Sequence, residues 1–331
     1  MLFKEDAAAR AQHDAVRKNV GWYRWTHDLL EVTGADSTRF LDYIFVNSIA
    51  KAPVGRSKYT AMLDEGGGII DDVIVTHMGE NHYWISTLYV PELKEWIVMH
   101  KGELDVRHKE LTCEVDMYAV QGPNAPALVN KLASAPVDGL KRFAMAENKI
   151  GGISARVHCG GFTGEAGYEI YCGIADSAAV SEAIRKAANE FDAPELRTLE
   201  VYVRSLPTEK GLALRQDFYG LNPFEAGIGW SVDFEKDFIG REATARAKEE
   251  GTARKLVGIE YEAESYEDIS QGERIRKNGR DVGFVRSAVY GYTVEKNIGF
   301  AIIDIGKVEI GDRVVVGCND SPAVIVEKRW I

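Results

Sequence analysis

Residues 59–75 read YTAMLDEGGGIIDDVIV, two apolar strand-like runs joined by a turn with three consecutive glycines. Two adjacent carboxylates, Asp71 and Asp72, lie inside the second run. Successive side chains of a strand point to opposite faces, so one of these carboxylates must enter the interior or line a cleft. Because burying an unpaired carboxylate is costly, it needs a hydrogen-bond donor, such as the Gly66–Gly68 turn, or a chemical role. The residues alone leave both explanations open.

The flanking sequence predicts a mixture of strands and helices. Strand-like runs occur at 25–32, 83–87, 114–120, 153–158 and 169–171, and helical patterns at 5–19, 37–45, 91–100, 123–132, 175–191, 195–205 and 240–250. Beyond Thr252, short strand-like runs alternate with turns at Asn278-Gly279 and Gly311-Asp312, which is typical of an antiparallel sheet. We therefore expect an α+β chain with a mixed α/β region at 1–250 and a C-terminal β-domain at 251–331.

Composition and cysteine spacing exclude several classes of protein. The 331 residues include 40 basic and 51 acidic side chains, and the net charge of −11 argues against a general nucleic-acid-binding protein. Four cysteines without a CxxC pair favour reduced packing residues in a cytoplasmic protein over a disulfide framework or a zinc site. The polar N-terminus does not resemble a secretory signal, and no apolar run reaches the roughly 20 residues that span a bilayer. We expect no metal, no membrane and no nucleic-acid partner.

Further segments carry polar residues or glycines in unusual places. Residues 160–171, GGFTGEAGYEIY, combine glycines that permit close backbone approach with Glu169 at the start of an apolar strand. An ordinary hairpin turn with an edge glutamate would give the same pattern. Residues 209–217, EKGLALRQD, and 222–230, NPFEAGIGW, fit a helix end and a capped loop equally well. The motifs GxGxxG, HExxH and GxSxG do not occur, which disfavours nucleotide-binding, zinc-protease and serine-hydrolase activities.

Six segments, taken together and in order, resemble the folate-dependent aminomethyltransferase family, whose founding member is the T-protein of the glycine cleavage system. They are YTAMLDEGGGIIDDVIV (59–75), YAVQGPNAP (118–126), GFTGEAGYEIY (161–171), EKGLALRQD (209–217), NPFEAGIGWSVDFEKDFIGREA (222–243) and NGRDVGFVRSAVY (278–290). The resemblance covers nearly the whole chain from about Trp25. It implies a three-part cloverleaf around a central channel for tetrahydrofolate, in which the C-terminal, barrel-like β-domain is the third part.

The resemblance also implies which residues bind the folate. A carboxylate can accept hydrogen bonds from the pterin N3–H and 2-amino group at once, and the family residue with that role matches Glu169. Asp72 matches the family's essential acidic residue near the folate nitrogens, and Tyr59 matches an aromatic residue on the folate. Phe162 stands where relatives carry Tyr. The expected cofactor-binding residues are Tyr59, Asp72, Ile74, Ser86, Phe162 and Glu169, and Glu209 is expected to be structural.

Departures from the family pattern bear on the donor of the one-carbon group. Ser86 replaces a folate-contacting Asn, and Pro207 stands where relatives usually have Arg. The chain also begins about 20 residues later than the T-protein, so its N-terminal helix or a partner is expected to close the channel. The stretches WTHDLLEVTGADSTRFLDYIFV (25–46) and YWISTLYVPEL (83–93) resemble the tetrahydrofolate-dependent O-demethylases of aryl methyl ethers. That branch would move a methyl group from a small methoxy-aromatic to N5 of tetrahydrofolate.

An aryl ether donor needs help with its leaving group, because a phenolate departs poorly. His27 is the expected catalytic donor to the phenolic oxygen, and Tyr23 and Trp25 are expected to hold the aromatic ring, although all three also fit core positions. Arg24, Arg56 and Lys58 are the candidates for binding a substrate carboxylate. The alternatives are aminomethyl transfer from a lipoyl carrier protein, methyl transfer from a corrinoid protein or an N-methyl donor, and non-catalytic folate binding in iron–sulfur assembly. Leu212, which breaks the Lys-Gly-Cys pattern of such assembly proteins, disfavours the last alternative.

Overall fold

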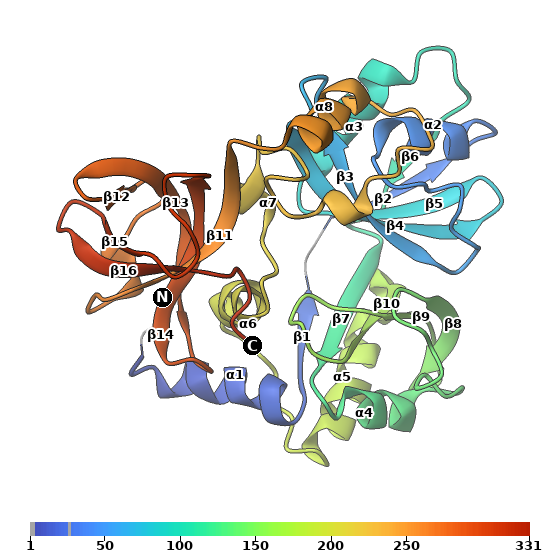
Figure 1. The fold of residues 1–331 in the computed structure, drawn as a ribbon. Helices are drawn as coiled ribbons and strands as arrows, with labels where there is room; N and C mark the ends of the chain where they lie inside the picture. The colour runs from blue at the N-terminus through green and yellow to red at the C-terminus, as the bar shows by residue number, and fades with distance from the viewer. Residues whose placement is uncertain (1–3, 26–27) are drawn as a thin grey trace.

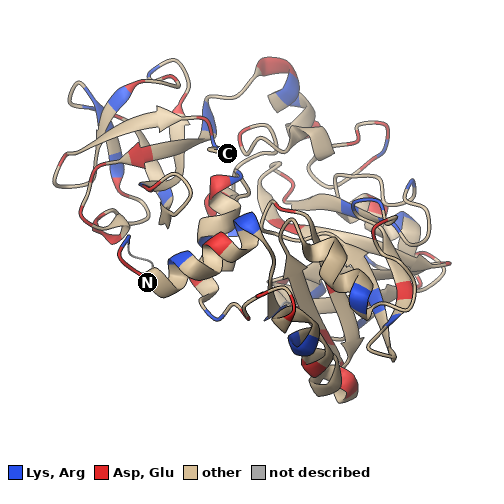
Figure 2. Cartoon of the chain, turned by 90° about the horizontal axis from the view of Figure 1, so that it is seen from below, with Lys and Arg blue, Asp and Glu red and all other residues tan. Residues whose placement is uncertain are grey.

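The computed structural model describes residues 4–25 and 28–331 and divides into two α/β lobes and a barrel (Figure 1). All named strand pairings are antiparallel. Acidic and basic side chains are interspersed along α1 and over both α/β lobes in the view from below (Figure 2).

The first sheet has the strand order β3 (Ser57–Leu63), β4 (Ile69–Gly79), β5 (His82–Thr87), β2 (Asp28–Thr33) and β6 (Arg107–Glu110). Helices α2 (Ser37–Ile44) and α3 (Val90–His100) supply apolar side chains to the core on one face of this sheet. That core takes the odd-numbered side chains of β4, Val73 and Val75. Asp72 and Ile74, which alternate with them, therefore point to the opposite face.

The second sheet has the strand order β1 (Gly21–Trp25), β7 (Val115–Gln121), β10 (Gly167–Gly173), β9 (Ile153–Cys159) and β8 (Met145–Ile150). Helices α4 (Ala125–Leu132) and α5 (Ser177–Asn189) cover one face, where Trp22, Tyr118 and Ile170 are buried. The alternate side chains point to the other face, where Tyr23 and Ala119 pack against α1 and against residues 201–206.

The C-terminal part is a closed six-stranded barrel. Its strands, in order around the barrel, are β11 (Arg254–Tyr261), β14 (Lys296–Asp304), β13 (Arg280–Gly291), β12 (Arg274–Lys277), β15 (Arg313–Val316) and β16 (Ser321–Val326). Asn278 and Gly279 have φ values of 53° and 74°, as the tight turn between β12 and β13 requires. The expected fold, mixed α/β lobes with a C-terminal antiparallel β-barrel, is confirmed.

Helix α1 (Ala7–Lys18) ties the lobes to the barrel through the buried carboxylate of Glu209. Glu209 lies in α6 (Leu206–Glu209), and its Oε2 accepts hydrogen bonds from Arg17 Nη2 at 2.9 Å and Thr293 Oγ1 at 2.7 Å. His13 Nε2 lies 2.9 Å from the same oxygen. Burial tends to raise the pKa of Glu209, but His13 and Arg17 outweigh it and hold the pKa below its usual value. Glu209 therefore lies at the centre of a buried hydrogen-bond network that joins α1, α6 and the barrel.

Several elements differ from the sequence-based expectations. Strands β1, β6 and β8 were not predicted, and the expected helix at 195–205 is a π-helix over Val201–Ser205 only. The helix expected from 123 begins at Ala125, and Cys113 and Cys318 are exposed rather than packed. The remaining helical segments are α7 (Arg215–Phe218), α8 (Arg241–Glu250) and the short 3-10 turns Ile174–Asp176, Gly229–Ser231 and Tyr266–Asp268. Over residues 4–25 and 28–331, no helix has the length and apolar character to cross a membrane.

Candidate active site

The site lies between the sheet faces that point away from the α2–α3 core of the first sheet and the α4–α5 core of the second. In the first sheet, Tyr59, Ile74 and Ser86 are register partners in one row across β3, β4 and β5. Asp72 precedes Ile74 by two residues and so lies on the same face. The four residues expected to bind folate from this half of the chain therefore share one surface.

The second sheet presents two parallel rows toward the first. Tyr23, Ala119, Glu169 and His158 are successive register partners, and so are Trp25, Met117, Tyr171 and Arg156. Contact between the sheets is direct, because Leu29 and Trp84 of the first sheet form one apolar cluster with Met117 and Tyr171 of the second. Segments far apart in the sequence thus converge on a single inter-sheet space.

The two adjacent aspartates occupy different surroundings. Asp71 is 2% exposed, and its Oδ2 accepts a hydrogen bond of 2.6 Å from the Thr87 hydroxyl. Burial raises the pKa of Asp71 to about 6. Two N–H groups of the glycine turn donate to Asp64 rather than to this pair, Gly68 to the carboxylate at 2.9 Å and Gly67 to the carbonyl at 3.0 Å. Asp71 therefore belongs to the packed face of the sheet.

Asp72 is a carboxyl group poised to change its protonation state near neutral pH. Burial is the main cause, and together with the neighbouring charge of Asp71 it raises the pKa of Asp72 to about 7. A hydrogen bond with Tyr59 tends to lower the pKa of Asp72, because it favours the ionised form. A group with a pKa near the working pH can both accept and donate a proton, which is what acid–base catalysis requires.

Trp230 extends the aromatic surface beside Asp72, and sequence reasoning did not single it out. It lies in the turn Gly229–Ser231, is 71% exposed, and stacks on Tyr59 with 5.5 Å between ring centroids. A tryptophan so exposed leaves most of its surface for another planar group. The only sequence signal was its place at the end of the 222–230 segment.

Glu169 is the corresponding carboxylate of the second sheet. Its side chain is 18% exposed, and its Oε2 lies 2.8 Å from His158 Nδ1 and accepts a 3.3 Å hydrogen bond from the Tyr171 hydroxyl. Burial, followed by the charge of Glu169, raises the pKa values of Tyr23 and Tyr171 well above their usual range. Both phenols stay protonated, so Glu169 lies in a partly accessible, donor-rich environment.

Of the residues expected to bind a donor substrate, the structure describes Tyr23 and Trp25, which pack against other aromatic rings. Tyr23 is 2% exposed and stacks on Tyr202 of the π-helix with 4.1 Å between centroids, while Trp25 meets both rings edge-on. One face of Tyr23 is therefore already covered. Phe162 is partly exposed in the glycine-rich turn before β10, and His27 lies outside the described residues.

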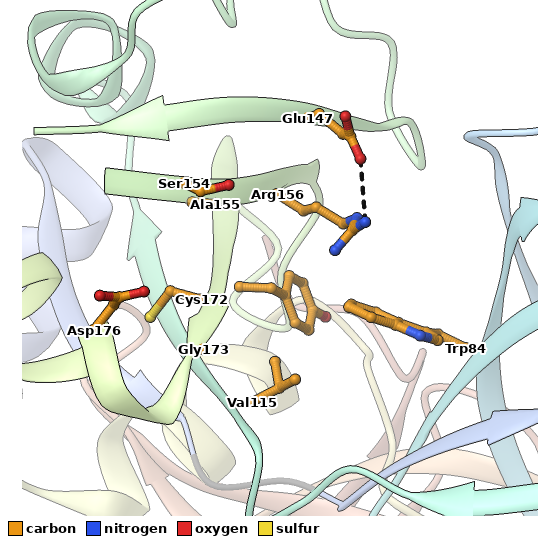
Figure 3. Close-up of a pocket in the computed structure, with 10 residues that line it drawn as sticks. Trp84, Val115, Glu147, Ser154, Ala155, Arg156, Cys172, Gly173 and Asp176 are labelled. Carbon is orange, nitrogen blue, oxygen red and sulfur yellow. Dashed lines mark hydrogen bonds and ion pairs between the residues drawn. The ribbon is translucent and has the colours of Figure 1, made fainter. Parts of the chain in front are cut away.

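Two cavities adjoin the row that contains Tyr171. One has a volume of about 310 Å³ and is lined by Trp84, Arg156 and Glu147 among others, with the Arg156 guanidinium 5.1 Å from the Trp84 ring (Figure 3). The other, of about 130 Å³, is lined by Arg24 and Trp25. Arg24 donates to Asp116 at 2.6 Å. Of the three cations considered for a substrate carboxylate, Arg24 is the one that lines either cavity.

The chemistry of these residues fits a reduced pterin. Such a ring presents adjacent N–H donors, for which Glu169 is a suitable acceptor, and a flat surface, for which Tyr59 and Trp230 are suitable partners. Asp72 faces the same space and can exchange a proton near neutral pH. Among the described residues, no group of three or more His, Cys, Asp or Glu side chains is arranged to hold a metal ion.

Comparisons with known proteins agree with this architecture. The GCVT N-terminal domain model matches residues 3–236, and the glycine cleavage T-protein C-terminal barrel domain model matches residues 254–330. The chain is 33% identical over 320 residues to an aminomethyltransferase of Geobacillus sp. (strain WCH70) and 34% identical over 320 residues to that of Bacillus subtilis (strain 168). Each alignment covers 94% of this chain and 86% of the relative. The crystal structure of glycine cleavage system aminomethyltransferase T from Bartonella henselae has the same fold, with a TM-score of 0.87 at 22% identity over 98% of this chain and 89% of that chain.

Proposed function

Because the chain belongs to the glycine cleavage T-protein family of folate-dependent aminomethyltransferases, we propose that it transfers a one-carbon group from a donor to N5 of tetrahydrofolate in the inter-sheet space. One observation supports this assignment more than any other. Asp72, with a pKa of about 7, and Glu169, a partly accessible carboxylate, lie on the two facing sheet surfaces. Such a pair can recognise a pterin and exchange its proton in one place.

In this proposal the folate-binding residues contact different parts of the cofactor. Glu169 accepts hydrogen bonds from the pterin N3–H and 2-amino group, while Tyr59 and Trp230 contact the flat part of the folate. Ile74, Ser86 and Phe162 form further walls. The surroundings support this division, because Tyr59, Ile74 and Ser86 form one row and each is only partly buried.

Asp72 is the proposed acid–base residue. Tetrahydrofolate supplies N5 as the atom that accepts the one-carbon group. Ionised Asp72 takes up the proton that N5 loses, and protonated Asp72 returns a proton to the departing group. With a pKa of about 7, both forms are substantially populated at neutral pH. The hydrogen bond with Tyr59 keeps the carboxyl oriented toward the inter-sheet space.

An aminomethyl group on a lipoyl carrier protein is the favoured donor. The relatives named above are aminomethyltransferases, which favours this donor over the methoxy-aromatic suggested by the resemblance of residues 25–46 and 83–93. The transferred carbon forms bonds to N5 and N10 while its C–S and C–N bonds to the donor break, so the carrier's thiol and ammonia both leave. The two protons that N5 and N10 lose pass to these leaving groups, and Asp72 can deliver the one that the amine needs. We further propose that the chain acts in the cytoplasm. We also propose that residues 1–250 form the folate-binding region and residues 251–331 the β-domain.

O-demethylation of a methoxybenzoate is the second candidate. The cavity of about 130 Å³ supports it, because Arg24 offers a cation for a carboxylate beside the Trp25 ring. Under this alternative Tyr23 and Trp25 hold the aromatic ring and His27 donates to the phenolic oxygen. A corrinoid protein or an N-methyl compound as the methyl donor is a third possibility that the same assay tests.

The donor is tested by incubating the protein with tetrahydrofolate and one donor at a time. The donors are an aminomethylated lipoyl carrier protein, a panel of methoxybenzoates, N-methyl amines and methyl-corrinoid, with mass spectrometry of the folate product. We expect a one-carbon folate together with ammonia from the carrier protein. Methylated folate with a phenol would favour O-demethylation instead. No folate product from any donor, despite tight folate binding, would contradict an enzymatic role.

A further inference from the structure

The imidazole of His158 connects the two sheets at the candidate site. We propose that His158 is a positioning residue that holds the Glu169 carboxylate in its pterin-binding orientation, through a hydrogen-bond chain that starts on the opposite sheet. This inference rests on the proposed role of Glu169. It concerns a residue that sequence reasoning did not single out.

The His158 side chain is fixed against Glu169 by strand register. The two residues are cross-strand partners in β9 and β10, so their side chains lie on the same face. His158 Nδ1 lies 2.8 Å from Glu169 Oε2, and His158 is only 3% exposed. The contact is therefore short, shielded from water and built into the pairing of the strands.

The second imidazole nitrogen reaches the other sheet. His158 Nε2 lies 3.2 Å from the hydroxyl oxygen of Ser57 in β3, and that oxygen lies 2.8 Å from the hydroxyl oxygen of Thr76 in β4. Both hydroxyl residues are nearly fully buried. Ser57 and Thr76 are register partners on the face that also presents Tyr59 and Asp72. The chain therefore links the sheet that carries Asp72 to the carboxylate of Glu169.

The carboxylate sets the direction of the first hydrogen bond in this chain. An ionised carboxylate can only accept, so His158 Nδ1 carries a proton and donates to Glu169. Its Nε2 accepts from the Ser57 hydroxyl when it carries no proton, and donates to that hydroxyl when it carries one. In either form the imidazole links Ser57 to Glu169, and linked hydrogen bonds polarise one another at a buried site.

The surrounding backbone is shaped to hold the ring. A Cβ atom on Gly160 would lie 2.6 Å from Cε1 of His158, so only glycine leaves room for the imidazole there. The Ser57 N–H donates to the Phe143 carbonyl at 2.8 Å, which fastens β3 to the second sheet beside the histidine. Phe143 itself has a φ of 60°, a left-handed conformation that a phenylalanine rarely adopts. These contacts hold His158 and Ser57, the two central members of the hydrogen-bond chain, in place.

Two substitutions separate the two contacts of the imidazole. The side-chain amide of His158→Asn places a donor near the position of Nδ1, whereas that of His158→Gln places one near the position of Nε2. If positioning matters, His158→Gln lowers the affinity for tetrahydrofolate by about tenfold, while His158→Asn stays within about threefold of the wild type. Calorimetric titration of the full-length protein measures both, and Ser57→Ala is expected to fall between them.

A double-variant cycle with Glu169→Gln distinguishes positioning from packing. We expect His158→Gln to weaken folate binding in the wild type but to add almost nothing once Glu169 is already Gln. Thermal melting of each variant checks folding. Equal affinity losses for His158→Asn and His158→Gln, or full additivity with Glu169→Gln, would overturn the inference and leave His158 as a packing residue.

The same variants distinguish a failure of the proposed role of Glu169 from a failure of the proposed role of His158. If Glu169→Gln binds tetrahydrofolate as tightly as the wild type does, the proposed role of Glu169 is wrong and the inference about His158 falls with it. If Glu169→Gln binds weakly while His158→Gln binds normally, the folate proposal stands and the positioning role alone is wrong. If His158→Gln does not fold, Ser57→Ala becomes the test. A Ser57→Ala variant that binds tetrahydrofolate with normal affinity would then overturn the inference.

Discussion

Replacing Asp72 with Asn should abolish most activity and yet stabilise the protein. The substitution keeps the size of the side chain and retains an acceptor for the Tyr59 hydroxyl, but it removes the charge and the transferable proton. Asp72 faces the inter-sheet space, while Asp71 lies on the packed face and accepts a hydrogen bond from Thr87. Asp71→Asn is therefore the matched control, with the same change in charge one residue away.

The stability effect follows from the raised pKa of Asp72, about 7 in the folded protein against 3.8 for an ordinary aspartate. The folded state binds the proton more tightly than the unfolded state does, so the free energy of unfolding falls as the pH rises from about 4 to about 7 and is level above that. At 1.36 kcal/mol per pKa unit, a shift of about three units corresponds to about 4 kcal/mol. Asp72→Asn removes this penalty, so the variant is more stable above neutral pH.

Urea denaturation at two pH values, paired with turnover, measures both effects. The stability advantage of Asp72→Asn over the wild type should grow by about 2 kcal/mol between about pH 5.5 and about pH 8. Turnover of Asp72→Asn should fall by a factor of about 100 or more, the lower range for losing a general acid or base, whereas Asp71→Asn should lose far less. An advantage independent of pH, or greater loss of activity in Asp71→Asn, would refute the reasoning.

Three further predictions concern the surroundings of the site. Tyr59→Phe removes a hydrogen bond that favours ionised Asp72, so the limb of the pH–rate profile that requires the ionised form should move to higher pH; an unchanged profile would separate Tyr59 from Asp72. Trp230→Ala should weaken tetrahydrofolate binding in a fluorescence titration by about 1 kcal/mol while barely changing the melting temperature, since the ring is exposed. Glu209→Gln should cost about 3 kcal/mol in urea denaturation, because it removes a buried carboxylate that accepts hydrogen bonds from Arg17 and Thr293, and the same change at exposed Glu295 should cost little; equal costs would contradict the buried network.

Local patterns in the sequence predicted the parts of the site that strand geometry controls. The alternation of a strand was enough to send Asp71 and Asp72 to opposite faces, and the structure places them so. The turn signals at Asn278-Gly279 likewise predicted a hairpin of the barrel. Glu169 at the start of an apolar strand was recognisable as a carboxylate that needed donors, although the residues that supply them were not.

Contacts between distant segments could not be predicted from spacing. His158 meets Ser57 only because the two sheets pack against each other, across 101 positions of the sequence. Tyr202, in the π-helix over Val201–Ser205, stacks on Tyr23 of β1, a contact that no spacing in the sequence indicates. The glycine turn was one of two explanations left open for the buried aspartate, and the hydrogen bond to Asp71 comes instead from the Thr87 hydroxyl of a more distant strand segment. In each case tertiary packing, rather than local propensity, determines the partner.

A crystal structure of the protein with bound tetrahydrofolate tests the central claim most directly. We predict that the pterin lies between the two sheets, with the Glu169 carboxylate within about 3 Å of N3 and the 2-amino group and with Asp72 on the side of N5. A pterin bound instead in the cavity lined by Trp84 and Arg156, out of hydrogen-bonding range of both Glu169 and Asp72, would contradict it.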